Sequence, residues 1–145
     1  MKRIMHATDF SPASRKAFKR ALAEAKDHHA ALTIVHVLSP VIGFVGDGSL
    51  APSTYEALLR STRAAAQKKL NALLASARSA RVRARGLLLE GVAHEQIVRA
   101  AKSHGADLLV VGTHGRTGVA RFFVGSVAGR VVASARCPVL TVRGG

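Results

Sequence analysis

Residues 112–126 read Gly-Thr-His-Gly-Arg-Thr-Gly-Val-Ala-Arg-Phe-Phe-Val-Gly-Ser. They follow an apolar run, Leu-Leu-Val-Val at 108–111, and precede residues 127–135, whose apolar side chains recur at helical spacing. The order strand, glycine-rich loop and helix is typical of a phosphate site. Glycines let the backbone turn tightly and approach an anion, and the first turn of a helix adds unpaired N–H donors and partial positive charge.

The glycines of this stretch suggest a division of roles within the site. We predict that Gly112 and Gly115 form its near wall, and that Gly125 and Ser126 form the N-terminal end of the helix. Serine is a favoured N-cap residue, so the Ser126 hydroxyl can serve either the helix or a phosphate oxygen. The sequence leaves both roles of Ser126 open.

Length and composition indicate one compact domain over residues 1–145, with a sizeable core. Hydrophobic residues make up 48% of the chain, and Cys137 is its one cysteine, which excludes an internal disulfide. No stretch approaches the roughly 18 apolar residues that a membrane span needs, and Asp9 interrupts the apolar start before a signal sequence could form. We therefore expect a cytoplasmic protein without a membrane partner.

The chain is strongly basic, with 22 Lys and Arg against 8 Asp and Glu and a formal charge of +14. Such a charge attracts polyanions, including nucleic acids, acidic lipids and phosphorylated small molecules. Only 4% of the residues are aromatic, which leaves little material for stacking bases. The alternative interpretation is that the basic residues form solvated helix faces without a specific target.

Apolar periodicity divides the chain into alternating strands and helices. Ser11 followed by Pro12 is a favourable helix start, and glycines and prolines between residues 39 and 53 predict an exposed loop. We expect strands at 2–8, 31–38, 83–89, 107–111 and 138–143, and helices at 12–28, 55–77, 95–103 and 126–135.

Five strands alternating with four helices predict an α/β fold, an open parallel sheet with helices on both faces. Ligands of such sheets bind at the carboxyl ends of the strands, where the strand order reverses. If the first and fourth strands are neighbours at that point, Asp9, Val37 and Gly112 share one crevice.

Two common phosphate-binding motifs are absent from the sequence. The first strand is followed by Thr-Asp-Phe-Ser at residues 8–11 rather than by Gly-x-Gly-x-x-Gly, which argues against nicotinamide binding. Gly125-Ser126-Val127 lacks the lysine of a Walker P-loop. The predicted phosphate site is therefore of a different kind.

The spacing Gly-x-x-Gly, nine residues, Gly-Ser on a strand, loop and helix resembles the ATP-binding branch of the universal stress protein family. The resemblance spans essentially the whole chain. It extends to Thr-Asp-Phe-Ser at 8–11, His-Val at 36–37, Gly91 with His-Glu-Gln-Ile at 94–97, and Cys-Pro-Val-Leu at 137–140. It implies a Rossmann-like fold of the adenine nucleotide alpha hydrolase type, with strand order 3-2-1-4-5 and ATP, with Mg²⁺, as the ligand.

Roles at matching positions are implied by the same resemblance. The backbone of Ala7 and Val37 would contact adenine, and Asp9 would contact the ribose or a magnesium-bridged phosphate. The remaining implied nucleotide contacts are Gly112, Thr113, His114, Gly115, Arg116, Gly125, Ser126 and Val127. Two departures from the family pattern are Ala7, where proline is common, and the unusual segment at 39–53.

Loop 112–126 contains no carboxylate and no glutamine to orient a water molecule, so we expect ATP to be retained with little or no hydrolysis. The alternatives are a slow ATP-hydrolysing enzyme and a basic protein associated with nucleic acid. Asp9 instead capping the first helix, and Arg116 as a solvated charge, also remain open. His6 and His36 are expected to be core histidines bonded to backbone.

The resemblance further implies a regulatory role in stress and a homodimer paired through the fifth-strand edge at Val139, Leu140, Thr141 and Val142.

Overall fold

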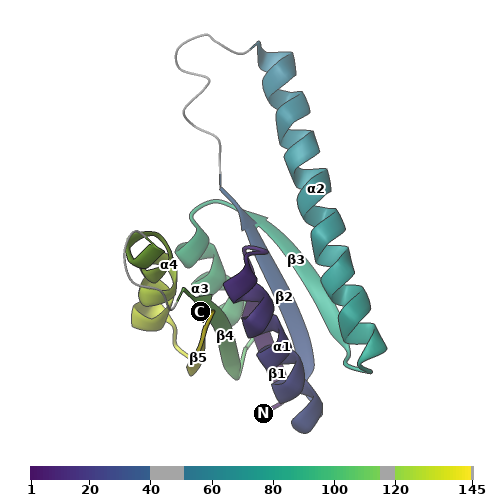
Figure 1. Ribbon diagram of the computed structural model, residues 1–145, viewed down its shortest axis with the longest axis vertical. Coiled ribbons are helices and arrows are strands. Elements are labelled where there is room, and N and C mark those ends of the chain that lie inside the picture. Colours follow the sequence, from purple (N-terminus) through teal and green to yellow (C-terminus); the bar gives the residue numbers. More distant parts are fainter. Residues whose placement is uncertain (40–50, 115–119, 145) are drawn as a thin grey trace.

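A computed structural model describes residues 1–39, 51–114 and 120–144, with only the backbone of residues 120–125. Five parallel strands form one sheet in the order β3-β2-β1-β4-β5, joined by four helices (Figure 1). The elements are β1 (Arg3–Ala7), α1 (Pro12–Asp27), β2 (Ala31–Leu38), α2 (Pro52–Ser79), β3 (Ala84–Glu90), α3 (Ala93–Ser103), β4 (Leu108–Thr113), α4 (Ala120–Ser134) and β5 (Val139–Arg143).

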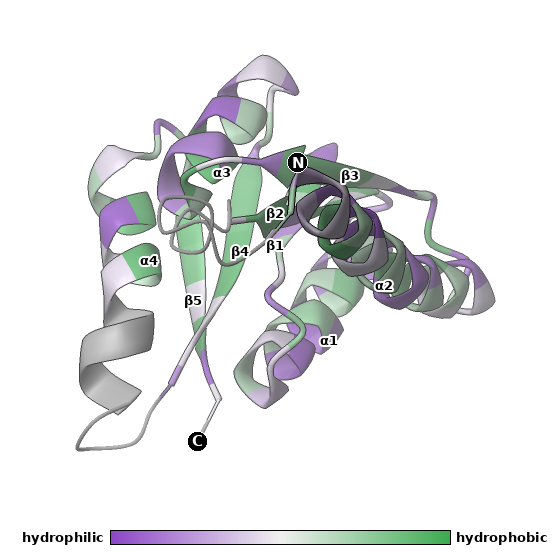
Figure 2. Cartoon of the chain, turned by 90° about the horizontal axis from the view of Figure 1, so that it is seen from above, coloured by the Kyte–Doolittle hydropathy of each residue, from purple (hydrophilic) through white to green (hydrophobic). Residues whose placement is uncertain are grey.

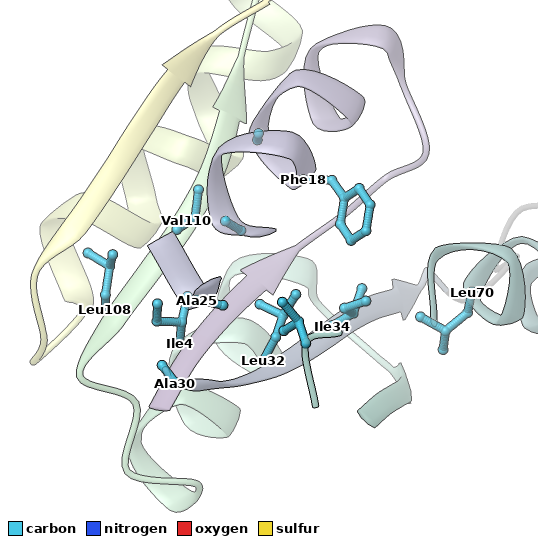
Figure 3. Close-up of a cluster of buried hydrophobic side chains, with 12 residues drawn as sticks. Ile4, Phe18, Ala25, Ala30, Leu32, Ile34, Leu70, Leu108 and Val110 are labelled. Atoms are coloured by element: carbon cyan, nitrogen blue, oxygen red, sulfur yellow. The ribbon is translucent and has the colours of Figure 1, made fainter. Parts of the chain in front are cut away.

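Helices cover both faces of the sheet, as the apolar strands require. Figure 2 shows α1 and α2 on one side of the strands and α3 and α4 on the other. Successive residues of β1 serve opposite faces: Ile4 packs with Phe18 of α1 and Leu70 of α2, whereas Met5 packs with Ile97 of α3 (Figure 3 shows the first cluster). The predicted α/β fold and the strand order are confirmed.

The start of α1 matches the sequence prediction. Ser11 is the N-cap, its side chain accepts a hydrogen bond from the Ser14 N–H, and Pro12 follows in the first turn. Proline is tolerated there because its missing N–H would have no helical partner.

Three helices begin earlier than the sequence predicts, and the smallest difference is at α3, which begins at Ala93 rather than at residue 95. Helix α2 begins at Pro52 rather than at residue 55, because proline fits the first helical position as well as it fits a loop. Helix α4 begins at Ala120 rather than at Ser126. Alanine and arginine at 120–121 favour a helix, and a glycine inside a helix costs only about 1 kcal/mol relative to alanine, so Gly125 does not end it.

Among the described residues, no helix combines the length and the hydrophobicity needed to cross a bilayer.

Candidate functional site

The carboxyl ends of β1 and β4 are neighbours, and the chain leaves them toward opposite faces of the sheet. Strand β1 leads into α1, and β4 leads to α4 on the other face. This divergence leaves a crevice where the strand order reverses. It holds a pocket with an inner space of about 140 Å³, or about 700 Å³ with the mouth that opens to solvent.

Five residues of the sequence-predicted site line this pocket: Ala7, Asp9, Val37, Gly112 and Val127. They come from three strands, the turn after β1, and α4. The sequence therefore brings together residues that are up to 120 positions apart, as the strand-end rule predicts.

The turn between β1 and α1 is fixed by a network of small polar side chains. Thr8 Oγ1 accepts hydrogen bonds from the Phe10 N–H (3.0 Å) and from the Ser14 hydroxyl (2.8 Å). Ser14 Oγ in turn accepts from the Asp9 N–H at 3.2 Å. Thr8 and Ser14 are both buried, so this network orders the backbone at the pocket wall.

Asp9 has an exposed side chain at the pocket. Its Oδ1 accepts a hydrogen bond from the Ser11 N–H at 2.9 Å, so the carboxylate bonds the turn before the helix, and the helix cap itself is Ser11. The described residues contain no cluster of three His, Cys, Asp or Glu side chains suited to a metal ion. A magnesium ion at Asp9 would therefore need oxygens from elsewhere, such as the phosphates of a nucleotide.

Gly112 is required by the packing of α1. A Cβ atom at this position would lie 2.8 Å from the carbonyl oxygen of Ala13 and 3.0 Å from the Ser14 nitrogen. These are backbone atoms of the first turn of α1, which cannot move aside as a flexible side chain can. The absent side chain thus lets the N-terminus of α1 lie against β4, beside the pocket, where its partial positive charge favours anions.

His36 bonds to backbone as the sequence predicts, but it lies half-buried in the pocket wall rather than in the core. Its Nδ1 lies 2.8 Å from the Thr8 carbonyl oxygen, which can only accept, so Nδ1 carries the proton. The imidazole also packs on Phe10, with 4.4 Å between ring centroids, and the Lys69 ammonium of α2 lies 5.6 Å from the Phe10 centroid. Phe10 has a φ of 63°, which lies in the left-handed region. The ring contacts with His36 and Lys69 stabilise this conformation.

The α4 side of the site differs from the sequence prediction. Because α4 begins at Ala120, Ser126 lies in the second turn of the helix and is not its N-cap. Gly125 is likewise within the helix backbone rather than at its mouth. Val127 and Ala128, the next two residues of the helix, line the pocket.

The remaining predicted residues lie on the loop after β4. Thr113 and His114 are partly exposed and are not part of the pocket lining, and the Thr113 carbonyl accepts a hydrogen bond from the Gly144 N–H at 2.6 Å. Gly115 and Arg116 lie outside the described residues.

Asp9 is the one carboxylate in the described lining of the pocket. Asp107 lies at the opposite edge of the sheet, where Oδ2 accepts from the backbone N–H groups of Lys2 (2.8 Å) and Arg3 (2.9 Å). These two hydrogen bonds lower the pKa of Asp107. Glu90 is exposed and pairs with Arg63 of α2.

Sequence reasoning missed most of the apolar and small polar lining. The residues it did not assign to the site are Thr8, Ser11, Ser14, Val35, His36, Ala93, Ile97, Val111 and Ala128. Thr8 and Ser11 were visible as neighbours of Asp9. Ala93 and Ile97 enter from α3. Ile97 is the last residue of the His-Glu-Gln-Ile stretch that resembles the family, and no local pattern in the sequence assigns Ala93 to this crevice.

A model of the universal stress protein family matches residues 1–143. The chain belongs to this family. A universal stress protein of Thermus aquaticus is 39% identical over 142 residues, covering 98% of both chains. One of Methanocaldococcus jannaschii is 36% identical over 144 residues, covering 98% of this chain and 82% of the relative.

Solved universal stress proteins share the fold. The UspA protein of Lactobacillus plantarum superposes with a TM-score of 0.82 at 26% identity, covering 98% of this chain and 97% of its own. A universal stress protein in complex with cAMP gives a TM-score of 0.73 at 23% identity, covering 99% and 98%. An Arabidopsis thaliana family protein with AMP bound gives 0.72 at 20% identity, covering 99% and 92%.

Proposed function

We propose that this universal stress protein binds ATP in the crevice between β1 and β4 and acts as a nucleotide-dependent regulator in the stress response. The observation that carries the proposal is the pocket at the point where the strand order reverses, with predicted contacts Ala7, Asp9, Val37 and Gly112 in its wall. The solved relatives with cAMP and AMP bound support an adenine nucleotide as the ligand.

The adenine end of the ligand fits the apolar part of the pocket. Ala7 and Val37 stand at the ends of neighbouring strands, and Ile97 is nearly fully buried beside them. We assign the adenine to this part, with the backbone of Ala7 and Val37 as its polar contacts. An apolar slot with few polar groups is typical of small-molecule sites.

The phosphates belong at the open end of the crevice. The N-terminus of α1 lies there beside Gly112, and helix N-termini favour anions. We propose that Thr113, His114, Gly115, Arg116, Gly125, Ser126 and Val127 complete the phosphate side. Asp9 would meet the ribose or a magnesium ion held jointly with the phosphates.

We further propose that turnover is slow. Asp9 is the one carboxylate of the described lining, and its Oδ1 already accepts the Ser11 N–H. Fast hydrolysis needs a group that orients water and charge focused on the transition state, and the described lining supplies no second acid for this task. The bound nucleotide then acts as a ligand rather than as a substrate.

We also propose that residues 1–145 act as one domain in the cytoplasm, as a homodimer paired through β5. The support for pairing is the position of β5 at the sheet edge, where backbone groups face away from β4.

The test is to denature freshly purified protein and identify the released nucleotide by chromatography. Gly115→Asp places a carboxylate among the phosphates and should abolish ATP retention. Gly129→Asp is the matched control, because it makes the same charge change on α4 at a position where a Cβ meets no atom within 4 Å. ATP in the parent and the control but not in Gly115→Asp supports the proposal. A parent that contains no nucleotide and takes up no added ATP overturns it.

A further inference from the structure

Basic residues are concentrated at the end of the sheet where the strands begin, opposite the ATP crevice; we call this end the amino edge. All strands begin there and the helices between them end there, so residues distant in sequence meet (the N-terminal end in Figure 1). A groove with about 590 Å³ of free space runs along this edge. Its charged lining consists of Lys2, Arg3, Arg83 and Arg85, joined by His104, and we call it the amino-edge groove.

Helix dipoles do not account for these four cations. Basic residues in the last turn of a helix complement its negative end, and Lys26, Arg78 and Lys102 occupy such positions. The groove cations instead lie on β1 and β3 or immediately before them, and strands have little net dipole.

Contacts hold the side chains of Arg85 and Arg3 in place, and none of the four groove cations forms an ion pair among the described residues. Arg85 donates from Nε to Thr33 Oγ1 (3.2 Å) and from Nη2 to His104 Nδ1 (2.9 Å), and both partners are uncharged acceptors. The Arg3 guanidinium lies over Gly105, with Cζ 3.1 Å from the place of a Cβ. The Asp107 carboxylate accepts hydrogen bonds from the backbone N–H groups of Lys2 and Arg3 and attracts the Arg3 charge. Among the described residues, no carboxylate lies within ion-pair distance of the side chains of these four cations.

The sheet register spaces the cations across several strands. Arg3 pairs with Ala31. Leu32 pairs with Ala84, so the residues just before them, Ala31 and Arg83, lie at the same level. Arg3 and Arg83 therefore lie level on either side of β2. Two inter-strand steps separate their backbones by about 10 Å. Arg85, two residues along from Arg83, faces the same side of the sheet. The cations therefore form a row across the strands and do not converge on one small anion.

We propose that the amino-edge groove binds the phosphate backbone of duplex nucleic acid without reading its sequence. A duplex presents a continuous array of phosphates, which suits a row of cations that form no ion pairs with the described residues. The described residues of the groove include no Phe, Tyr or Trp, so bases of a single strand would find no stacking platform there. The excess charge of +14 provides long-range attraction to the same target.

The test measures binding of a fluorescent duplex of about 20 base pairs by anisotropy, between about 50 and 200 mM salt. The variant is Arg83→Glu with Arg85→Glu. The matched control is Lys16→Glu with Lys19→Glu, which makes the same charge change on the exposed side of α1. Each phosphate that the protein no longer neutralises should reduce the slope of log affinity against log salt by about 0.9, so the slope of the groove variant should fall by about 2.

We expect the groove variant to bind at least about tenfold more weakly at low salt while the control stays within about threefold of the parent. Equal losses in both variants would mean that net charge alone drives binding and would overturn the proposal. No binding by the parent, or displacement of the duplex by inorganic phosphate at constant ionic strength, would overturn it too. If the Glu variant fails to fold, the slope of log affinity against log salt is measured for Arg83→Gln with Arg85→Gln, and the same fall is expected.

ATP retention of the same variants separates this proposal from the nucleotide site. The crevice lies at the other edge of the sheet, so ATP retention by the groove variants should match the parent whether or not they bind duplex.

Discussion

His6 is the residue at which burial and ionisation oppose each other most directly. Its side chain is fully buried, and the centroids of the His6 and Phe18 rings lie 5.9 Å apart. Nδ1 donates to the Val110 carbonyl at 3.1 Å, and Nε2 has no hydrogen-bond partner among the described residues. Burial lowers the pKa of His6 from 6.5 to about 4, because the charged imidazolium loses its hydration.

This shift predicts a loss of stability in mild acid. Below pH 6.5 the unfolded chain binds a proton at residue 6 that the folded protein takes up only near pH 4. The free energy of unfolding therefore falls as the pH drops through this window, by about 2 kcal/mol from His6 alone between pH 7 and pH 5. Urea unfolding at the two pH values measures the difference.

The control for this prediction is His6→Asn, which keeps a side-chain N–H donor but does not titrate. Its loss of stability between pH 7 and pH 5 should be about 2 kcal/mol smaller than that of the parent. An identical loss in both proteins would show that His6 does not govern the acid response.

Single residues also mark the limit of prediction from sequence. The backbone bonds of His6 and His36 are confirmed, because a histidine in an apolar strand must satisfy a ring nitrogen locally. Gly112 was predicted for its freedom to approach phosphate, and the structure adds a second reason, the backbone of Ala13. That contact joins residues about 100 positions apart, and nothing in the local sequence encodes it.

At the scale of elements, α2 has two unlike halves. Its buried residues are Ala66, Leu70 and Ala77, all from the C-terminal half that packs on β2 and β3. The N-terminal half extends past the sheet (Figure 1), and Leu58 and Leu59 remain 43% and 40% exposed. Isolated helical turns are marginal in water, so this half depends on the packed half for its stability.

Amide hydrogen exchange of α2 should follow this division. We expect the amides of residues 56–64 to exchange at least about tenfold faster than those of residues 70–78, because opening the first half exposes little buried apolar surface. Mass spectrometry of peptides from each half measures the two rates. Equal protection would contradict the prediction and would mean that another surface covers the N-terminal half in solution.

The alternation of elements was predictable from sequence, but the start of α4 was not. Apolar runs and helical spacing located all five strands and four helices to within a few residues elsewhere. At α4, Gly125-Ser126 has the composition of a helix start, yet the helix continues through both residues from Ala120. Local propensity is weak at such boundaries, so the residues on either side decide where the helix begins.

At the scale of the whole molecule, the parallel sheet separates two chemical environments. The carboxyl edge carries the pocket with Asp9, and the amino edge carries the groove with Arg83 and Arg85. The position of the pocket followed from the strand order, which the resemblance to the universal stress protein family implied. The positions of Ala93 and Ile97 in its wall did not, because they depend on how α3 packs across the sheet.

The outer side of β5 is the feature of the sheet that bears on assembly. Leu109 N–H donates to the Pro138 carbonyl (3.0 Å), and Gly144 N–H donates to the Thr113 carbonyl (2.6 Å). Hydrogen bonds of a parallel ladder alternate along the strand, so the backbone groups of Val139 and Thr141 point away from β4. In the homodimer that we propose, these groups would pair with the β5 strand of a second copy.

The homodimer prediction can be tested at Thr141, whose side chain is exposed. In a two-fold antiparallel pairing centred on Leu140 or Thr141, the two Thr141 side chains lie on the same face, diagonal to or directly opposite each other, so Thr141→Asp would bring two carboxylates together. We expect the parent to sediment as a dimer at micromolar concentration and Thr141→Asp to dissociate at least about tenfold more readily, with Gly129→Asp as the charge control. A monomeric parent, or a dimer that tolerates Thr141→Asp as well as Gly129→Asp, would place the contact elsewhere, because like charges facing each other across a strand pair must weaken it.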